Sequence, residues 1–347
     1  MINLNFQDNL LKWYEINKRL LPWRETQDPY KIWVSEIMLQ QTQVKTVIDY
    51  YNRFIKVFPN VEALSKATED EMHRLWQGLG YYSRADKMML CAKEVVKNHE
   101  GQFPKDHKDM LSLPGIGPYT AGAVLSIAYN MPFPAVDGNV MRVISRQFNI
   151  QEDISIPRTR KVFEEKVQSI LPKDVRHFNQ ALMELGALIC TPKNPKCEIC
   201  PVVNSCVGYK AKNVELLPIK TKKTKKTNHI MAVAYVKCED QIMITKRPNQ
   251  GILANLWGFP IIEVHSKDEA LKEMVNELQE IYGLEVEYIA EKNQAKHIFT
   301  HRIWEMQFFE FKGKNKVMID FPNVKWLPED EIKDFHFPTA FKKLVSN

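Results

Sequence analysis

Four of the six cysteines in this chain lie close together, at Cys190, Cys197, Cys200 and Cys206, with six, two and five residues between them. Thiolates that bind one centre must converge, and the Pro and Asn residues of this stretch favour the turns that convergence requires. Four thiolates suit a structural zinc ion and a four-iron cluster equally well, and the spacing alone does not choose between them. Disulfides and unpaired core cysteines are the other interpretations, and disulfides are disfavoured without a secretory signal.

Length and composition predict a soluble protein of two or more domains. The chain has 347 residues, of which 44% are hydrophobic, which is enough for more than one core. Its first residues mix charged and apolar side chains at helical spacing, so we expect neither a signal peptide nor a membrane span. We therefore expect a cytoplasmic monomer, associated with the nucleoid in a prokaryotic cell. The net charge of +6 is a mild excess that indicates a polyanionic partner.

The pattern of apolar residues changes along the chain and predicts two domains. Residues 1–212 show helical spacing, for example at 44–58, where Pro59 ends the pattern, and they predict an all-α domain. Residues 213–228 read as a basic linker, because 220–226 have the sequence KTKKTKK. Residues 229–347 predict an α+β domain, with a helix that begins at a capping box of Ser266 and Glu269. Its strands are predicted at 230–236, 241–247, 304–311 and 324–327.

A turn suited to phosphate binding lies at 113–120, with the sequence LPGIGPYT. Gly115 and Gly117 allow a tight connection between two helices, and the free N–H groups at the start of the second helix can hold an anion. Such contacts grip nucleic acid without reading its sequence, although a plain helix–helix turn has the same residues. Asp137 follows in another turn, where it is either a cap residue or a functional charge near the phosphate site.

The turn at 113–120, the sequence VDGNV at 136–140 and the cysteine loop occur in the order and spacing of the helix-hairpin-helix DNA glycosylase superfamily, which this chain resembles. The resemblance implies a [4Fe-4S] cluster on the four cysteines. WVSEIMLQQTQV at 33–44 and GLGYYSRA at 78–85 are similar to the adenine-excising members, over nearly the whole chain. The resemblance implies a monofunctional enzyme that flips adenine out of duplex DNA opposite 8-oxoguanine or guanine. Hydrolysis of the N-glycosidic bond would then initiate base excision repair.

Removal of adenine requires an acid for the leaving base and a negative charge for the cationic sugar. Glu36 has apolar neighbours that favour its protonated form, although a glutamate near a helix start is also ordinary. The resemblance makes Glu36 the acid, which later activates water, and Asp137 the group that stabilises or attacks the sugar carbon. Tyr119 stands where related strand-cleaving enzymes have a lysine, and a phenol cannot form an imine. Asn139 would orient the catalytic groups, or be only a turn former.

Further contacts with the substrate come from the resemblance alone. Gln41 and Tyr81 are expected to fill the gap left by the flipped base and to contact the opposite base. Each of these side chains is individually compatible with an ordinary helix surface or core. The remaining residues expected near the adenine or its partner are Arg24, Leu39, Thr42 and Leu79.

Residues 229–347 resemble the Nudix-like C-terminal domain of the same enzymes, most clearly in ITKRPNQGILANLWGFP at 244–260. The acidic array that binds magnesium in Nudix hydrolases is missing, since the glutamates of 269–285 have the spacing of a solvent face. We therefore expect recognition without hydrolysis. The sequence Phe299-Thr300-His301 takes the place of a Phe-Ser-His loop that reads 8-oxoguanine, with threonine in place of serine. His301 would contact phosphate or merely close a hairpin.

Three other functions share part of this pattern. A mismatch thymine or uracil glycosylase would have the same turn, aspartate and cluster, but not Glu36 in SEIMLQQT or the Nudix-like domain. A non-catalytic iron–sulfur sensor of damaged DNA would not need both Glu36 and Asp137. A Nudix hydrolase of free nucleotides is disfavoured by the missing glutamates.

Overall fold

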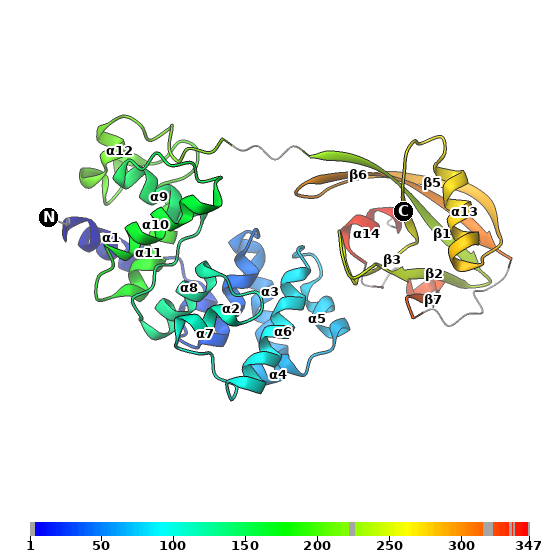
Figure 1. Ribbon diagram of the computed structural model, residues 1–347, viewed down its shortest axis with the longest axis horizontal. Coiled ribbons are helices and arrows are strands. Elements are labelled where there is room, and N and C mark those ends of the chain that lie inside the picture. The colour runs from blue at the N-terminus through cyan, green and yellow to red at the C-terminus, as the bar shows by residue number, and fades with distance from the viewer. Residues whose placement is uncertain (1–3, 222–225, 315–321, 333–334, 336, 346–347) are drawn as a thin grey trace. The chain divides into compact units, whose positions relative to one another are not determined.

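The computed structural model describes residues 4–221, 226–314, 322–332, 335 and 337–345 (Figure 1). The chain forms two compact units, one of Met1–Leu75 and Ser83–Lys223, the other of Trp76–Tyr82 and Thr224–Asn347. Of the linker predicted at 213–228, residues 222–225 lie outside the described residues. The assignment of Trp76–Tyr82 to the second unit differs from the predicted boundaries. Within the described residues, no helix combines the length and apolar character that crossing a membrane requires.

The first unit is helical, as the sequence predicts (Figure 1). Its described elements are α1 (Leu4–Asn17), η1 (Pro22–Arg24), α2 (Pro29–Leu39), α3 (Val44–Val57), α4 (Val61–Ser65), α5 (Glu69–Trp76), α6 (Ser83–Asn98), α7 (His107–Ser112), α8 (Pro118–Tyr129), α9 (Gly138–Phe148), η2 (Pro157–Thr159), α10 (Arg160–Gln168), α11 (Val175–Leu188), η3 (Cys197–Ile199), η4 (Val203–Ser205) and α12 (Val207–Lys210). The helix predicted at 44–58 is α3, which buries Val47, Tyr51 and Phe54 on one face and ends just before Pro59.

The predicted glycine turn connects α7 to α8. Gly115 has a φ of +78°, a left-handed conformation that glycine adopts without strain. Gly117 is the N-cap of α8 and Pro118 fills its first turn, so the start of the helix needs no side-chain cap. Helix α8 is buried on almost every side, because small residues let neighbouring chain approach closely. At Gly122 an added Cβ would lie 2.0 Å from the carbonyl oxygen of Pro134, directly before the turn that carries Asp137.

A hydrophobic core of the helical unit joins α1, α9, α10 and α11. It brings Phe6 and Leu10 of α1 against Val140, Ile144 and helix α11, which lie far along the chain. The elements that contain Asp137, Arg160 and Glu184 are therefore fixed relative to one another by buried apolar side chains.

The second unit contains a seven-stranded sheet (Figure 1). Its strands are β1 (Thr227–Cys238), β2 (Gln241–Lys246), β3 (Trp257–Gly258), β4 (Ile261–Val264), β5 (Val286–Ile298), β6 (Arg302–Gly313) and β7 (Val324–Pro328). The strand order is β3-β2-β1-β6-β5, with β4 paired to β1 and β7 paired to β2. Strands β1 and β6 run parallel, and the other pairs are antiparallel. Helix α13 (Ala270–Tyr282) contributes to one core and α14 (Thr339–Val345) to the other, while η5 (Glu329–Glu331) follows β7.

The four predicted strands and the predicted helix of this unit are present. Helix α13 begins at Ala270, after a turn in which the backbone N–H of Glu269 donates to Ser266 Oγ at 3.3 Å. Met274 and Leu278 are fully buried, whereas Glu280 is exposed, which confirms an amphipathic helix. Strands β3, β4 and β5 were not predicted from the sequence.

Candidate active site and cluster loop

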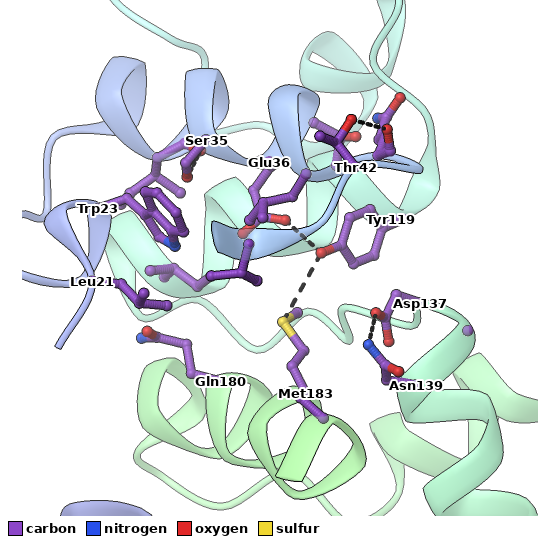
Figure 2. Close-up of a pocket in the computed structure, with 18 of the residues that line it drawn as sticks. Leu21, Trp23, Ser35, Glu36, Thr42, Tyr119, Asp137, Asn139, Gln180 and Met183 are labelled. Atoms are coloured by element: carbon purple, nitrogen blue, oxygen red, sulfur yellow. Dashed lines mark hydrogen bonds between the residues drawn. The ribbon is translucent and has the colours of Figure 1, made fainter. Parts of the chain in front are cut away.

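A cavity of about 660 Å³ lies in the helical unit and contains most of the predicted catalytic residues (Figure 2). Its walls are α2, the turn before α8, the start of α9, the start of α10, α11 and the segment around η1. Ten residues predicted from the sequence line it: Arg24, Glu36, Leu39, Gln41, Thr42, Gly115, Gly117, Tyr119, Asp137 and Asn139. The fold thus brings together motifs that are separated by more than a hundred positions in the sequence.

Glu36 projects from α2 into this cavity and is 5% exposed. The pKa of the Glu36 carboxyl is raised to about 7, mainly by burial and in part by the nearby Asp137 charge, against the opposing effects of the Tyr119 hydrogen bond and the Arg24 charge. The Tyr119 hydroxyl donates a hydrogen bond to Glu36 Oε2 and also contacts Met183 Sδ at 3.9 Å (Figure 2). Burial and the two nearby carboxylates raise the pKa of Tyr119, so its phenol stays neutral and can donate. The carboxyl of Glu36 can therefore hold a proton near neutral pH.

Asp137 is the N-cap of α9, so the cap and functional-charge interpretations apply to the same side chain. Its Oδ1 accepts the backbone N–H of Val140 at 2.7 Å, and its Oδ2 accepts Asn139 Nδ2 at 3.0 Å (Figure 2). Burial raises the pKa of Asp137, while these hydrogen bonds favour the carboxylate. Glu36 and Asp137 line one cavity in different environments, one beside a phenol and apolar groups, the other at a helix N-terminus.

Arg142 connects the Asp137 turn to the cysteine loop. Its guanidinium donates to Asn139 Oδ1 at 2.8 Å, to the carbonyl oxygen of Gly186 at 2.8 Å and to that of Cys190 at 2.7 Å. The side chain is 8% exposed, so these bonds form in a desolvated setting. The position of Asn139 is therefore tied to the first cysteine of the loop.

Gln41, expected to act as a wedge, lies at the end of α2. It is exposed and has a φ of +57°, which is uncommon for a residue other than glycine. The buried guanidinium of Arg84 holds the preceding turn, with hydrogen bonds to the carbonyl oxygens of Ile37, Met38 and Gln40 at 2.6–3.0 Å. Tyr81, the other expected wedge, also has a positive φ, of 49°, and is 43% exposed. Backbone strain of this kind is concentrated at functional sites.

The other predicted contacts lie outside the cavity. Leu79 and Tyr81 lie between α5 and α6, where Leu79 is buried. Phe299, Thr300 and His301 form the turn between β5 and β6 in the second unit. Phe299 N–H donates to the carbonyl oxygen of Arg302 at 2.8 Å, which closes the turn, and Thr300 and His301 are exposed. The hairpin expected as an alternative for His301 is present, and its exposed tip leaves both side chains accessible.

Several cavity residues were not found from the sequence, among them Arg19, Trp23, Arg160, Gln180, Met183 and Glu184. Gln180, Met183, Glu184 and Ala187 repeat at intervals of three or four positions and share one face of α11. The signal in the sequence that could have revealed this face was a polar glutamine and glutamate, Gln180 and Glu184, among otherwise apolar residues at helical spacing. Arg19 and Trp23 lie within five positions of Arg24, which the sequence predicts to lie near the adenine.

The four clustered cysteines line one small cavity of about 30 Å³, beside α9. Arg146 Nη1 donates to Cys190 Sγ at 3.4 Å, and Cys206 Sγ donates to the carbonyl oxygen of Arg146 at 3.4 Å. In the described part of the chain, no three ligating side chains converge as they would on a single metal ion. Four cysteine sulfurs around one shared cavity match the ligand set of a four-iron cluster, whose cysteines bind different irons. The residues therefore fit the expected group.

Comparison with known proteins agrees with this geometry. Residues 34–173 match the model for HhH-GPD superfamily base excision DNA repair proteins. Residues 190–206 match the iron-sulfur binding domain of endonuclease III, and residues 231–347 match a NUDIX domain. A solved thermostable thymine-DNA glycosylase aligns with a TM-score of 0.55 and 32% identity, over 59% of this chain and 95% of that chain. The fold and the site therefore define a helix-hairpin-helix DNA glycosylase of base excision repair with a [4Fe-4S] cluster.

Relatives over most of the chain specify the group further. The adenine DNA glycosylase of Buchnera aphidicola subsp. Schizaphis graminum is 40% identical over 268 residues, which cover 76% of each chain. That of Rattus norvegicus is 32% identical over 396 residues, covering 98% of this chain and 77% of the rat protein. The chain belongs to the adenine DNA glycosylase family. The predicted fold class, cofactor and enzyme class are confirmed.

Proposed function

We propose that this enzyme excises adenine opposite 8-oxoguanine or guanine in duplex DNA by hydrolysis, and leaves the DNA backbone intact. The observation that carries the proposal is the pairing, in one cavity, of a buried Glu36 that holds a proton near neutral pH with Asp137 at a helix N-terminus. A cavity of about 660 Å³ is large enough for a flipped nucleotide.

The first step is departure of the base. Glu36 transfers its proton to a ring nitrogen of adenine as the bond between the sugar and the base breaks, and the bonding electrons leave with adenine. The sugar carbon then carries oxocarbenium character, which the Asp137 carboxylate stabilises from the start of α9. The hydrogen bonds from Val140 and Asn139 hold that carboxylate in place. Two carboxyl groups in unlike environments thus divide the acid and anion roles.

The second step is attack by water. Glu36, now ionised, accepts a proton from water as the oxygen bonds to the sugar carbon, which regenerates the acid and yields free adenine and an abasic site. The neutral Tyr119 phenol donates to Glu36 Oε2 and so stabilises its anionic state. A phenol forms no imine, so strand cleavage through a Schiff base is unavailable at this position.

Other residues are assigned to recognition of the DNA and of the partner base. Gly115 and Gly117 offer backbone N–H groups to a phosphate, and the exposed Gln41 and Tyr81 are suited to fill the gap in the stack. Thr300 carries a hydroxyl at an exposed turn, where it can donate to or accept from the Hoogsteen edge of the partner base.

Single-turnover excision tests this function. Duplexes with A opposite 8-oxoguanine, A opposite guanine, T opposite guanine and A opposite T are incubated with excess enzyme and developed with and without alkali. We expect alkali-dependent cleavage at adenine in the first two alone. Cleavage at thymine would show that the chain is a mismatch thymine glycosylase. Tight binding without cleavage would indicate a sensor of damaged DNA.

A further inference from the structure

Glu184, on α11, is the hub of a buried charge cluster in the wall of the cavity. Its side chain is 0% exposed and it accepts hydrogen bonds from two arginines. Arg19 donates from its backbone N at 2.9 Å, from Nε at 2.8 Å and from Nη2 at 2.7 Å. Arg24 donates from Nη1 at 3.0 Å and from Nη2 at 2.7 Å. Both carboxylate oxygens are therefore fully used.

The two arginines are also held to each other. Arg24 Nη1 donates to the carbonyl oxygen of Arg19 at 3.1 Å, and the Arg24 side chain is only 12% exposed. Burial alone would raise the pKa of Glu184, but the hydrogen bonds from Arg19 and Arg24 lower it to about 2, so the group is ionised at neutral pH. The cluster thus contains two cations and one anion, a net charge of about +1.

Glu36 lines the same cavity as the cluster, and the charge of Arg24, a member of the cluster, acts on it. The charged and titratable groups that line the cavity from the elements around Glu36 are Arg19, Arg24, Tyr119, Asp137, Arg160 and Glu184. Arg24 lowers the pKa of Glu36, against the effect of burial, because a nearby cation favours the carboxylate. A second uncompensated cation at this wall would therefore work against the acid that the reaction needs.

We propose that Glu184 is a positioning residue that fixes Arg19 and Arg24 in the cavity wall and cancels one of their two charges, so that Glu36 keeps its proton at neutral pH. The inference rests on the proposed role of Glu36 as the acid. It explains why a carboxylate is buried here rather than an apolar residue of similar size, since replacement of a buried ion pair by apolar groups is often neutral for stability. It also gives Arg24 a defined place in the wall as a hydrogen-bond donor.

The test changes the charge of the cluster in both directions. Single-turnover excision of adenine opposite guanine is measured with saturating enzyme from below to well above neutral pH, and the pH at which the rate begins to fall is compared. Glu184→Gln raises the net charge. We expect the alkaline limb of the profile, where the rate falls as the pH rises, to move to lower pH by on the order of one unit. Arg19→Gln lowers the net charge, and we expect the limb to move up. The double variant restores the original charge, and its limb should return to the wild-type position.

The controls separate charge from folding. Glu184→Asp keeps the charge and should leave the limb in place, even if the rate falls. Lys161→Gln removes a cation whose side chain is 79% exposed, away from the cavity, and should also leave the limb in place. If Glu184→Gln does not fold, the upward shift in Arg19→Gln still decides the question, and a fixed limb in that variant contradicts the proposal.

Two outcomes overturn the inference. One is a loss of rate in Glu184→Gln that is equal at every pH, which is the signature of a purely structural role. The other is a limb that stays displaced in the double variant. Glu36→Gln is measured alongside: near-normal excision by that variant refutes the proposed function itself, whereas an inactive Glu36→Gln together with an immobile limb refutes only the role of Glu184.

Discussion

Glu36 is costly for the fold and, as the proposed acid, would be useful for the reaction. Its neighbours on α2 are apolar and buried, and burial raises the pKa of the carboxyl from 4.5 to about 7. A carboxyl whose pKa is raised by folding is protonated below the shifted value and ionised above it. The rate of a reaction that uses Glu36 as an acid should therefore fall about tenfold for each pH unit above about pH 7, whereas protonation of Asp137, whose pKa is also raised, should lower it at acid pH. A single-turnover pH profile measures this.

Glu36→Gln is expected to lose adenine excision but to retain DNA binding, because the amide keeps the shape and cannot transfer the proton. Binding to a duplex with adenine opposite guanine and single-turnover excision on the same duplex are the two measurements. Near-normal excision by this variant would exclude Glu36 as the acid. Arg53→Gln, on α3 outside the cavity, is a suitable control and should excise normally.

The same substitution has a consequence for stability. The unfolded chain releases the Glu36 proton near the ordinary pKa of 4.5 and the folded chain only near 7, so ionisation favours the unfolded state as the pH rises between these values. Glu36→Gln removes this cost. We expect the variant to be more stable than the wild type by about 3 kcal/mol at about pH 8, and equally stable at about pH 4. Denaturant melts at the two pH values test this, and an equal difference at both would contradict it.

The residues that the sequence revealed are those with local motifs. Glu36, Tyr119 and Asp137 stand in short recognisable segments, and the structure places all three in one cavity. Glu184 was missed because its meaning depends on Arg19, which lies 165 positions away and meets it only after folding. No local pattern of charge or spacing encodes such a pair.

At the scale of elements, close approach between helices positions the catalytic turn. Gly186 of α11 faces α9, where an added Cβ would lie 2.7 Å from the Cβ of Asn139. Gly186→Ala should therefore displace Asn139, which donates to Asp137, and lower single-turnover excision by at least tenfold while DNA binding changes less. The cost in stability should be about 1–3 kcal/mol. Normal excision by Gly186→Ala would contradict the role of this packing.

Elements were predicted well where one face is buried and poorly where it is not. Helix α3 buries one face, and strands β1, β2 and β6 carry runs of buried residues. Strand β7 is an exception, since it was predicted although its residues are exposed or only partly buried. Strand β5 was missed because its residues are exposed or only partly buried, and because two irregularities in its pairing with β6 interrupt the alternation. Its pairing with β6 comes from backbone hydrogen bonds, which leave no periodic signal in the side chains.

For the whole helical unit, we expect the cluster loop to act as a structural support. Cys197→Ser removes one of the four thiols that line the cluster cavity, and we expect lower iron content, a lower melting temperature and weaker excision. Iron analysis and thermal melts of the purified protein are the measurements. Cys238→Ser, in the second unit, should leave iron content unchanged. A soluble Cys197→Ser protein with normal DNA binding and kinetics would show that the cluster has no structural role.

In the proposed function, the chemistry and the recognition of the partner base take place in different units. The proposed acid and anion lie in the helical unit, whereas Thr300 lies in the second unit, on an exposed turn. Thr300→Val keeps the shape of the side chain but removes the hydroxyl, and we expect the preference for 8-oxoguanine over guanine to fall about tenfold, the value of one hydrogen bond. Excision of adenine opposite guanine should be unchanged, because the catalytic cavity is untouched. Thr300→Ser should keep the preference, since the hydroxyl remains. An equal loss on both duplexes would instead indicate that the turn contributes general DNA affinity and does not read the oxidised base.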